Sequence, residues 1–245
     1  MPVKIAVVIP ARYASTRFPG KPLFPLAGKP MIRHVWERCS RAGGIDRVIV
    51  ATEDRRIAAA CADFGAECAM TSEKCRSGTD RVAEVASRSL KGFTHVINVQ
   101  GDEPLVNPAT ISKLARTLAA SPDIGMITCA TAFAPGEDVG NPNAVKVVTD
   151  RNGDALYFSR SPIPFVRDHS PGLAMQRHQG IYGYTLELLF QFVKWKPAPL
   201  ERAESLEQLR ALENGAKIRV VSIRHAAIGV DTPADVEAVL SLLSK

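Results

Sequence analysis

Near its N-terminus the chain reads KIAVVI (residues 4–9) and then PARYASTRFPGKP (residues 10–22), a strand pattern that runs directly into a cationic loop. The unbroken apolar run is typical of a strand buried on both faces of a sheet. The loop holds two arginines, a lysine, two hydroxyl side chains and a glycine. Outward-facing backbone N–H groups and such cations together bind phosphate oxygens. We therefore expect a site for a triphosphate or similar polyanion, with a merely solvated basic turn as the alternative.

The first 140 residues alternate between strand and helix patterns. Apolar runs predict buried parallel strands at residues 5–9, 48–51, 66–70, 96–99 and 124–131. Helical spacing of apolar residues separates them, for example at Ile111, Leu114, Ala115 and Leu118. This alternation predicts an α/β fold with an open, doubly wound sheet, whose ligands bind outside the carboxyl ends of the strands.

The pattern changes beyond about residue 141. Two short strand patterns, 145–148 and 155–158, flank a turn, and residues 176–185 have a glycine-interrupted β pattern. A helix is expected at 200–212, a strand at 218–223 and a final helix near 236–243. With no linker or repeat, we expect one domain over 1–245. Its parts are a nucleotide-binding part (1–140), an antiparallel extension that binds the sugar and forms a dimer contact (141–228), and a metal-ligand loop with the final helix (229–245).

Composition excludes several classes of protein. Hydrophobic content of 46% and charged content of 23% are ordinary for a globular protein. The net charge of +6 is spread along the chain among acidic residues, which argues against nucleic-acid binding. No apolar run is long enough to span a bilayer, and no signal peptide precedes the first strand. The five cysteines are odd in number and lack a Cys-x-x-Cys pair, so we expect reduced thiols and a cytoplasmic protein.

Two acidic loops are candidates for a metal site. Asp102 follows the strand pattern at 96–99, and Asp231 precedes the final helix. Carboxylates at the carboxyl edge of a sheet can hold Mg²⁺, which prefers oxygen ligands. Both segments also have simpler interpretations, a turn at Gly101-Asp102 and a helix cap before Pro233.

A group of polar side chains in the second half has the chemistry of a site for a polyhydroxylated acid. Cations suit a carboxylate, and the other members suit hydroxyl groups. The group consists of Arg160, Arg177, His178, Tyr182, Tyr184, Glu207 and Gln208. The alternation of a strand places His178, Tyr182 and Tyr184 on one face. In the first half, the segment Ser77–Arg81 suits either a helix cap or an edge that binds a base.

Eight segments in order resemble the 3-deoxy-manno-octulosonate cytidylyltransferases, also called CMP-Kdo synthetases. They are ARYASTRFPGKP, SGTDR, NVQGDEP, NPNAVKVV, ALYFSR, RHQGIYGY, LEQLR and GVDTP, and they extend over nearly the whole chain. The resemblance implies a nucleotide-diphospho-sugar transferase-like fold, a mixed sheet and a homodimer. It also implies an enzyme that converts CTP and 3-deoxy-D-manno-octulosonate (Kdo) into CMP-Kdo and pyrophosphate for lipopolysaccharide biosynthesis.

The resemblance also implies residue roles. Nucleotide contacts fall on Ala11, Arg12, Ser15, Thr16, Arg17, Lys21, Ser77, Gly78, Arg81 and Gln100. Sugar contacts fall on Gln100, Arg160, His178, Tyr182, Glu207 and Gln208. Asp102 and Asp231 are the implied Mg²⁺ ligands, and with Arg12 and Lys21 they make up the expected catalytic set.

Two positions depart from the family pattern. Cys75 replaces a usual histidine, and Gln179 replaces a usual aliphatic residue. Gln179 adjoins His178, so another acidic sugar, such as 8-amino-Kdo or a nonulosonate, stays open as the substrate. A catalytically silent nucleotide-binding regulator is the alternative from another class. A dinucleotide-dependent oxidoreductase is disfavoured because no Gly-x-Gly-x-x-Gly follows the first strand.

Overall fold

The structure of the chain is a computed structural model. It describes residues 2–14, 18–168, 174–224, 226, 228–230 and 232–243. Four residues with expected roles, Ser15, Thr16, Arg17 and Asp231, lie outside the described residues.

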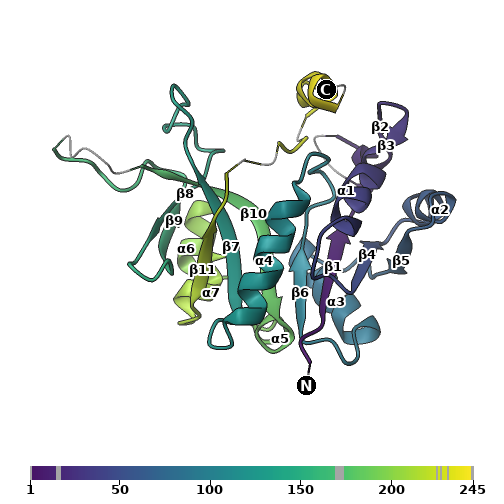
Figure 1. Ribbon diagram of the computed structural model, residues 1–245, viewed down its shortest axis with the longest axis horizontal. Helices are drawn as coiled ribbons and strands as arrows, with labels where there is room; N and C mark the ends of the chain where they lie inside the picture. The colour runs from purple at the N-terminus through teal and green to yellow at the C-terminus, as the bar shows by residue number, and fades with distance from the viewer. Residues whose placement is uncertain are drawn as a thin grey trace.

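A nine-stranded mixed sheet forms the centre of the molecule, with the path β11-β7-β10-β6-β1-β4-β5 (Figure 1). Its parallel half contains β1 (Ile5–Pro10), β4 (Arg47–Thr52), β5 (Glu67–Met70) and β6 (His95–Asn98). In the other half, β10 (Gln176–Thr185) runs antiparallel between β6 and β7 (Met126–Ala132), and β11 (Ile218–Ser222) pairs parallel with β7. The prediction of an α/β fold with a mixed, doubly wound sheet is confirmed.

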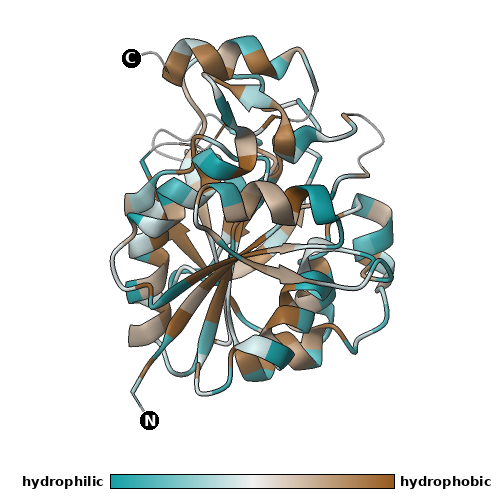
Figure 2. Ribbon diagram, turned by 90° about the vertical axis from the view of Figure 1, so that its right-hand side faces the viewer, coloured by the Kyte–Doolittle hydropathy of each residue, from teal (hydrophilic) through white to brown (hydrophobic). Residues whose placement is uncertain are grey.

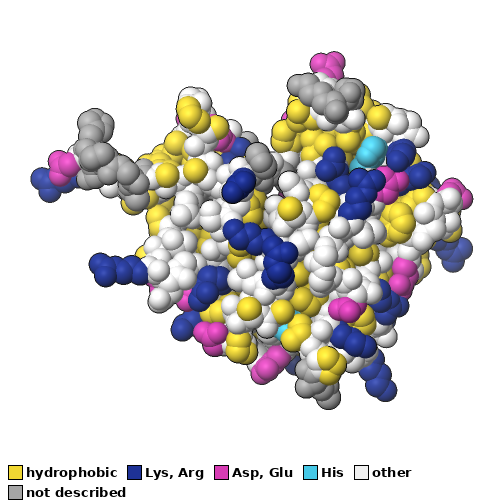
Figure 3. Space-filling model, in the orientation of Figure 1, with side chains coloured by type: hydrophobic (Ala, Val, Ile, Leu, Met, Phe, Trp, Pro, Cys, Tyr) yellow, Lys and Arg dark blue, Asp and Glu magenta, His cyan; other side chains and the backbone are white. Residues whose placement is uncertain are grey.

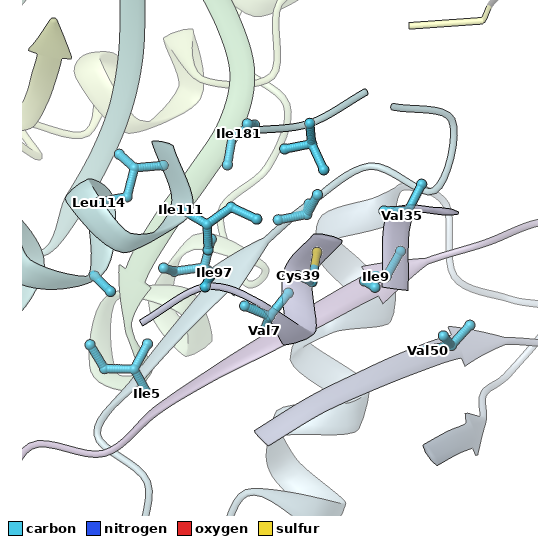
Figure 4. Close-up of a cluster of buried hydrophobic side chains, with 14 of the residues drawn as sticks. Ile5, Val7, Ile9, Val35, Cys39, Val50, Ile97, Ile111, Leu114 and Ile181 are labelled. Atoms are coloured by element: carbon cyan, nitrogen blue, oxygen red, sulfur yellow. The ribbon is translucent and has the colours of Figure 1, made fainter. Parts of the chain in front are cut away.

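Helices cover both faces of the sheet, and Figure 2 shows hydrophobic strands crossing between them. One face packs against α1 (Met31–Ser40), α2 (Arg55–Asp63) and α4 (Pro108–Ala120). Figure 4 shows part of this core, where Val7 and Ile97 of the strands lie near Cys39 of α1 and Ile111 of α4. The opposite face packs against α3 (Gly78–Ser89), α5 (Leu186–Phe192) and α7 (Leu209–Glu213). Burial of both sheet faces explains why the strands read as continuous apolar runs.

The antiparallel extension projects from the sheet at one side of the molecule (Figure 1). Strands β8 (Lys146–Thr149) and β9 (Ala155–Ser159) form a hairpin, and β8 also pairs with the start of β10. The Asp150 carboxylate closes the turn because it accepts the N–H groups of Asn152 and Asp154. Gly153 has φ of 82°, a conformation that favours glycine.

Three small elements lie near the ends of the central strands. A 3₁₀ helix, η1 (Lys21–Leu23), follows the cationic loop, and β2 (Pro25–Leu26) pairs with β3 (Lys29–Pro30). The last helix, α8 (Asp235–Leu243), contributes Val236 and Val239 to a separate apolar cluster with Leu26 and Met31. This cluster attaches the C-terminal segment to the segment that follows the cationic loop.

Strand β10 contains a bulge with a specific register. Gln179 pairs with Cys129 of β7, but Tyr182, three residues later, pairs with Thr128. The strand thus holds two extra residues at this point. Because side chains alternate with a period of two, a shift of two leaves His178, Tyr182 and Tyr184 on the same face. The expectation that these three share a face is confirmed.

The expected single helix at 200–212 is wrong, since the chain forms α6 (Pro199–Glu204) and α7 (Leu209–Glu213) instead. Ser205, between them, has a left-handed φ of 51°. Arg160 donates hydrogen bonds to the carbonyl oxygens of Glu204 and Ser205. Those carbonyls would otherwise accept the next helical N–H groups, so the contact with Arg160 takes the place of a continued helix.

All five cysteines are free, as expected, and Cys39, Cys61 and Cys129 are buried. No helix among the described residues is both long enough and apolar enough to cross a membrane.

Candidate active site

The order in which the chain adds strands to the sheet reverses at β1, and this reversal locates the candidate site. The chain adds β4 and β5 on one side of β1, and then returns through α3 to add β6 on the other side. Ligands bind at such a switch point, outside the carboxyl ends of the strands. Here those ends lead into Ala11-Arg12 after β1 and Gln100–Glu103 after β6.

A cleft of about 780 Å³ lies beside this edge. One wall is formed by exposed Arg12, by the segment that joins β5 to α3, and by the first turn of α3. The opposite wall comes from the segment between α5 and α7, including Trp195, Arg202 and Glu207. The cleft therefore joins residues of the expected nucleotide-binding part to residues of the expected sugar-binding part.

Tyr13 organises the described part of the cationic loop. Its N–H donates to Glu53 (3.2 Å), and its carbonyl accepts the N–H of Gly20 (2.9 Å). The Arg56 guanidinium lies 3.3 Å from the centre of the Tyr13 ring. A Cβ at Gly20, whose φ is 71°, would come within 3.2 Å of that ring. The loop is thus closed on itself, with Arg12 at its cleft side.

Arg81 lies beneath the loop and not at the cleft surface, with an exposed fraction of 1%. Its guanidinium contacts the Thr71 hydroxyl and lies 2.7 Å from the Glu53 carboxylate, which holds Tyr13. Sequence reasoning missed Glu53, because an acidic residue after a strand carries no distinctive signal. Arg81 is thus connected to the cationic loop through Glu53, and a direct contact of Arg81 with a nucleotide stays a prediction.

The first turn of α3 lies against the end of β1. Ser77 caps the helix by accepting the N–H of Asp80 (3.1 Å), and Asp80 accepts the N–H of Ser77 in return. A Cβ at Gly78 would lie 3.3 Å from Pro10 and 3.6 Å from the Gln100 amide oxygen. Glycine therefore allows the positive end of the α3 dipole to lie close to the strand ends.

Glu84 anchors the segment that leads into α3. Its carboxylate accepts the N–H of Ser72 (3.1 Å) and the thiol of Cys75 (3.1 Å), and it pairs with Arg88. Burial and the Glu84 carboxylate raise the pKa of Cys75 to about 11, so its thiol remains protonated and can donate. The departure at Cys75 thus places a hydrogen-bond donor in the wall of the cleft.

Asp102 and Lys21 meet at the edge of the sheet. The Lys21 ammonium donates to the Asp102 carboxylate (2.6 Å) and to the Val230 carbonyl (2.8 Å). The N–H of Val230 donates to the Asp102 carbonyl (2.9 Å). The preceding Gly101 has no room for a side chain, since a Cβ would lie 2.8 Å from the Pro10 carbonyl oxygen. Three separate segments are thereby joined at Asp102.

Glu103, the next residue, was not singled out from the sequence because it follows Asp102 in an ordinary turn. Burial, together with the Asp102 charge, raises the pKa of its carboxyl to about 8. Its Oε2 is buried and has no hydrogen-bond partner among the described residues. Among those residues, no three His, Cys, Asp or Glu side chains are grouped as a metal cluster would require.

A partly buried hydrogen bond connects the two halves of the candidate site. The Thr79 hydroxyl of α3 donates to the Glu207 carboxylate (2.6 Å), just before α7. Gln208 is 4% exposed, and its amide nitrogen has no partner among the described residues. The guanidinium of Arg160, by contrast, donates hydrogen bonds to the carbonyls of Pro142, Glu204 and Ser205. The structure thus joins Glu207 to α3 and holds Arg160 in the extension.

His178 and Tyr182 belong to a row of aromatic rings across the antiparallel half. The row comprises Phe158, His178, Tyr182, Tyr184, Phe192 and Trp195, with successive ring centres 5.0–6.2 Å apart. Burial lowers the pKa of His178 to about 3, so its imidazole is neutral. The Nε2 of His178 lies 2.8 Å from the hydroxyl oxygen of Thr128, another residue that sequence reasoning missed.

A family model for cytidylyltransferases matches residues 6–218. Over 98% of its length the chain is 51% identical to the whole of a 3-deoxy-manno-octulosonate cytidylyltransferase from Geobacter sulfurreducens. This chain belongs to the cytidylyltransferase family. An enzyme of the same name from Pseudomonas syringae is 49% identical over 99% of each chain.

Solved cytidylyltransferase structures have the same fold. A structure of CMP:2-keto-3-deoxy-manno-octonic acid synthetase complexed with CTP superposes with a TM-score of 0.93, at 41% identity over 98% of each chain. A 4-diphosphocytidyl-2C-methyl-D-erythritol synthase from Anaerococcus prevotii has a TM-score of 0.65 at 14% identity, over 99% of this chain and 97% of its own, which supports the fold alone. The resemblance inferred from the eight segments is confirmed, and the individual residue roles stay predictions.

Proposed function

We propose that this cytidylyltransferase transfers CMP from CTP to the anomeric hydroxyl of Kdo, giving CMP-Kdo and pyrophosphate for lipopolysaccharide biosynthesis. The observation that carries the proposal is identity of about half the residues over nearly the full chain to enzymes named for this reaction. The cleft supports it, because cationic and hydrogen-bonding walls suit two substrates that are both anionic.

The parallel half is the proposed site of CTP. Arg12 and Lys21 would hold phosphate oxygens, together with Ser15, Thr16 and Arg17. The N-terminus of α3, with Ser77 and Gly78, lies in the wall of the cleft and would face the cytidine. Helix N-termini and guanidinium groups favour negative charge, so both features lower the repulsion between the substrates.

The antiparallel half is the proposed site of Kdo. Glu207 reaches the cleft and has a charged acceptor for sugar hydroxyl groups. The unpartnered amide nitrogen of Gln208 is a donor that a buried site would use. Gln100 leaves the end of β6 between the two halves, in agreement with a contact to both substrates. Arg160, His178 and Tyr182 complete the proposed sugar contacts.

The side chains at the sheet edge fit Mg²⁺. Asp102 pairs with Lys21 through Oδ2 and keeps 36% of its side chain exposed, so a carboxylate oxygen remains available. Asp231 follows Val230, whose backbone is bonded to Asp102, and is the proposed second ligand. Oxygen donors of this kind suit a hard cation. Bound there, Mg²⁺ would polarise the α-phosphate and favour ionisation of a coordinated hydroxyl.

The reaction is a displacement at phosphorus. The anomeric oxygen of Kdo forms a bond to the α-phosphorus of CTP, the bond from that phosphorus to the bridging oxygen breaks, and the hydroxyl proton leaves to solvent. Arg12 and Lys21 would stabilise the charge that develops on the departing pyrophosphate. His178 is too weak a base to take the proton, given its pKa of about 3. Positioning and electrostatic stabilisation therefore carry the rate.

Two further features stay predictions, a homodimer formed through the extension and a cytoplasmic location. Nucleic-acid binding is not favoured, because Lys and Arg residues are interleaved with acidic residues along the chain. On the face shown in Figure 3, Lys and Arg side chains gather in separate groups at the centre and the upper right. The function is tested against two alternatives, an enzyme that uses another acidic sugar and a catalytically silent regulator.

The test is pyrophosphate release from CTP and Mg²⁺ with Kdo, 8-amino-Kdo or N-acetylneuraminate in parallel. We expect release with Kdo. Release with only another sugar would keep the chemistry and change the substrate. Protein that binds CTP but releases no pyrophosphate with any sugar would support the regulator instead.

A further inference from the structure

We propose that Thr128 is a positioning residue that holds His178 in one tautomer, with the proton on Nε2, so that Nδ1 accepts a hydrogen bond from a hydroxyl group of the sugar. The inference deepens the proposed function and rests on it for the identity of the sugar. Nothing in the sequence pattern marks Thr128, which lies within an apolar strand pattern.

The hydroxyl of Thr128 is completely buried in β7 and lies among three polar atoms of β10. Its oxygen is 2.8 Å from Nε2 of His178, 2.9 Å from the Ile181 carbonyl oxygen and 3.2 Å from the Gln179 carbonyl oxygen. The two carbonyls can only accept hydrogen bonds, whereas an imidazole nitrogen can donate or accept according to tautomer.

Counting protons decides between the two tautomers. The hydroxyl has one proton, and the geometry directs it to a carbonyl, with Ile181 the nearer. If the proton pointed to an unprotonated Nε2 instead, the hydroxyl oxygen would face two carbonyl oxygens at 2.9 and 3.2 Å with no proton between them. Oxygen atoms that face one another at hydrogen-bond distance with no proton between them repel. Nε2 therefore carries the proton and donates a hydrogen bond to the Thr128 hydroxyl oxygen.

The bulge in β10 creates this environment. The two extra residues between Gln179 and Tyr182 interrupt the ladder with β7 opposite Thr128 and Cys129. The carbonyls of Gln179 and of Ile181, which lies in the bulge, are within hydrogen-bond distance of the Thr128 hydroxyl. A hydroxyl at residue 128 can donate its one proton to a carbonyl there, which an aliphatic side chain cannot do.

The remaining nitrogen of His178 is an acceptor. The ring lies edge-on to Phe158, with centres 5.0 Å apart and planes at 77°, and next to Tyr182. Its Nδ1 has no hydrogen-bond partner among the described residues. Tyr182 pairs with Asn98 at the end of β6, so His178, further along β10, lies at the edge of the sheet where ligands bind. A neutral imidazole with a free Nδ1 lone pair selects a hydroxyl donor over a carboxylate.

The experiment is ¹⁵N NMR of the histidine ring nitrogens in the ligand-free full chain, with His178 assigned by its loss in His178→Gln. In the wild type and in Thr128→Ser we expect the Nε2-protonated pattern at pH 7. In Thr128→Val we expect a mixture of tautomers. The same three proteins are assayed for pyrophosphate release. Thr128→Val should raise KM for Kdo about tenfold and leave KM for CTP within about twofold, whereas Thr128→Ser should restore wild-type values.

An Nδ1-protonated His178 in the wild type would overturn the inference, even if Thr128→Val failed to fold. Equal increases in both KM values, with an unchanged tautomer, would show a purely structural role for Thr128 and would also overturn it. The NMR measurement needs no sugar. If the wild type instead shows the Nε2 tautomer but gives no reaction with Kdo, the proposed function fails and the assigned tautomer stands.

Discussion

The parallel and antiparallel halves of the sheet hold their candidate site residues in different ways. In the parallel half, the functional side chains lie in loops that follow strand ends, and backbone contacts such as those of Tyr13 hold these loops in place. In the antiparallel half, His178 and Tyr182 lie within β10 itself, and neighbouring rings hold them. If the proposed roles hold, the loops present N–H groups and cations to phosphate, and β10 fixes the directions of the side chains that contact the sugar.

The largest effect is expected at Asp102, where the parallel half meets the C-terminal segment. Asp102→Asn should lower kcat by about two to three orders of magnitude, because it removes the charge paired with Lys21 and a proposed Mg²⁺ ligand. The fold should survive, since Lys21 keeps its bond to Val230. The measurements are turnover and thermal unfolding. Asp54→Asn is the control, because asparagine still caps α2. Near wild-type turnover in Asp102→Asn would contradict the metal assignment.

Lys21→Ala should separate the two halves kinetically. The ammonium lies in the parallel half, so its loss should raise KM for CTP by about tenfold or more and KM for Kdo by much less. Initial rates with each substrate varied in turn provide the measurement. Lys29→Ala, which breaks a comparable pair with Glu37, should change neither constant. A larger effect on Kdo than on CTP would show that the loop assignment is wrong.

Thr79→Val should affect both halves together. Its hydroxyl binds Glu207 across the cleft, and a hydrogen bond to a charged group contributes about 1.5–3 kcal/mol. We expect both KM values to rise several-fold and the Tm to fall by about 3–12 °C, at roughly 2–4 °C per kcal/mol for a chain of this size. Thr79→Ser, which keeps the hydroxyl, is the matched variant. If only one KM rose, the two walls would act independently.

The smallest effect concerns the pH dependence of stability in the antiparallel half. Burial lowers the pKa of His178 to about 3 in the folded protein, against about 6.5 when unfolded. Between these values the unfolded chain binds more protons, so the contribution of His178 to stability is present above pH 6.5 and is lost as the pH falls towards 3. Thermal unfolding of the wild type and of His178→Gln should therefore converge from pH 7 to pH 4.

Between pH 7.5 and 8.5 the difference in Tm between these two proteins should stay constant, because His178 is neutral in both states there. This range serves as the internal control. A difference that changes equally across both pH ranges would show that another group is responsible.

Much of the fold followed from local pattern. The bounds of β10 matched its glycine-interrupted β pattern, and the continuous apolar runs located the buried strands. The break at Ser205 could not be foreseen, because it depends on Arg160, which is 45 residues away in sequence. Secondary-structure propensity depends on neighbouring residues in the sequence and does not include such a distant contact. The apolar spacing of a helix also continues through the break.

The residues of the candidate site were also predicted from the sequence only in part. Among the residues that form motifs, Ser77, Gly78 and Asp80 line the cleft, and Asp102 lies at the edge of the sheet. Glu53, Glu84 and Thr128 were not found, because they act by holding other residues and their partners come from separate strands or turns. The motif around Arg81 did not reveal that its guanidinium is buried, since burial is a property of the packed structure.

The two-residue shift in β10 has a consequence for how sequences of this kind can vary in length. An insertion or deletion of one residue between Gln179 and Tyr182 would turn His178 to the opposite face of the sheet, into the layer occupied by α4. A change of two residues would keep every side chain of the strand on its face. Related chains are therefore expected to differ here by even numbers of residues only, and an odd difference would mark a protein with another substrate.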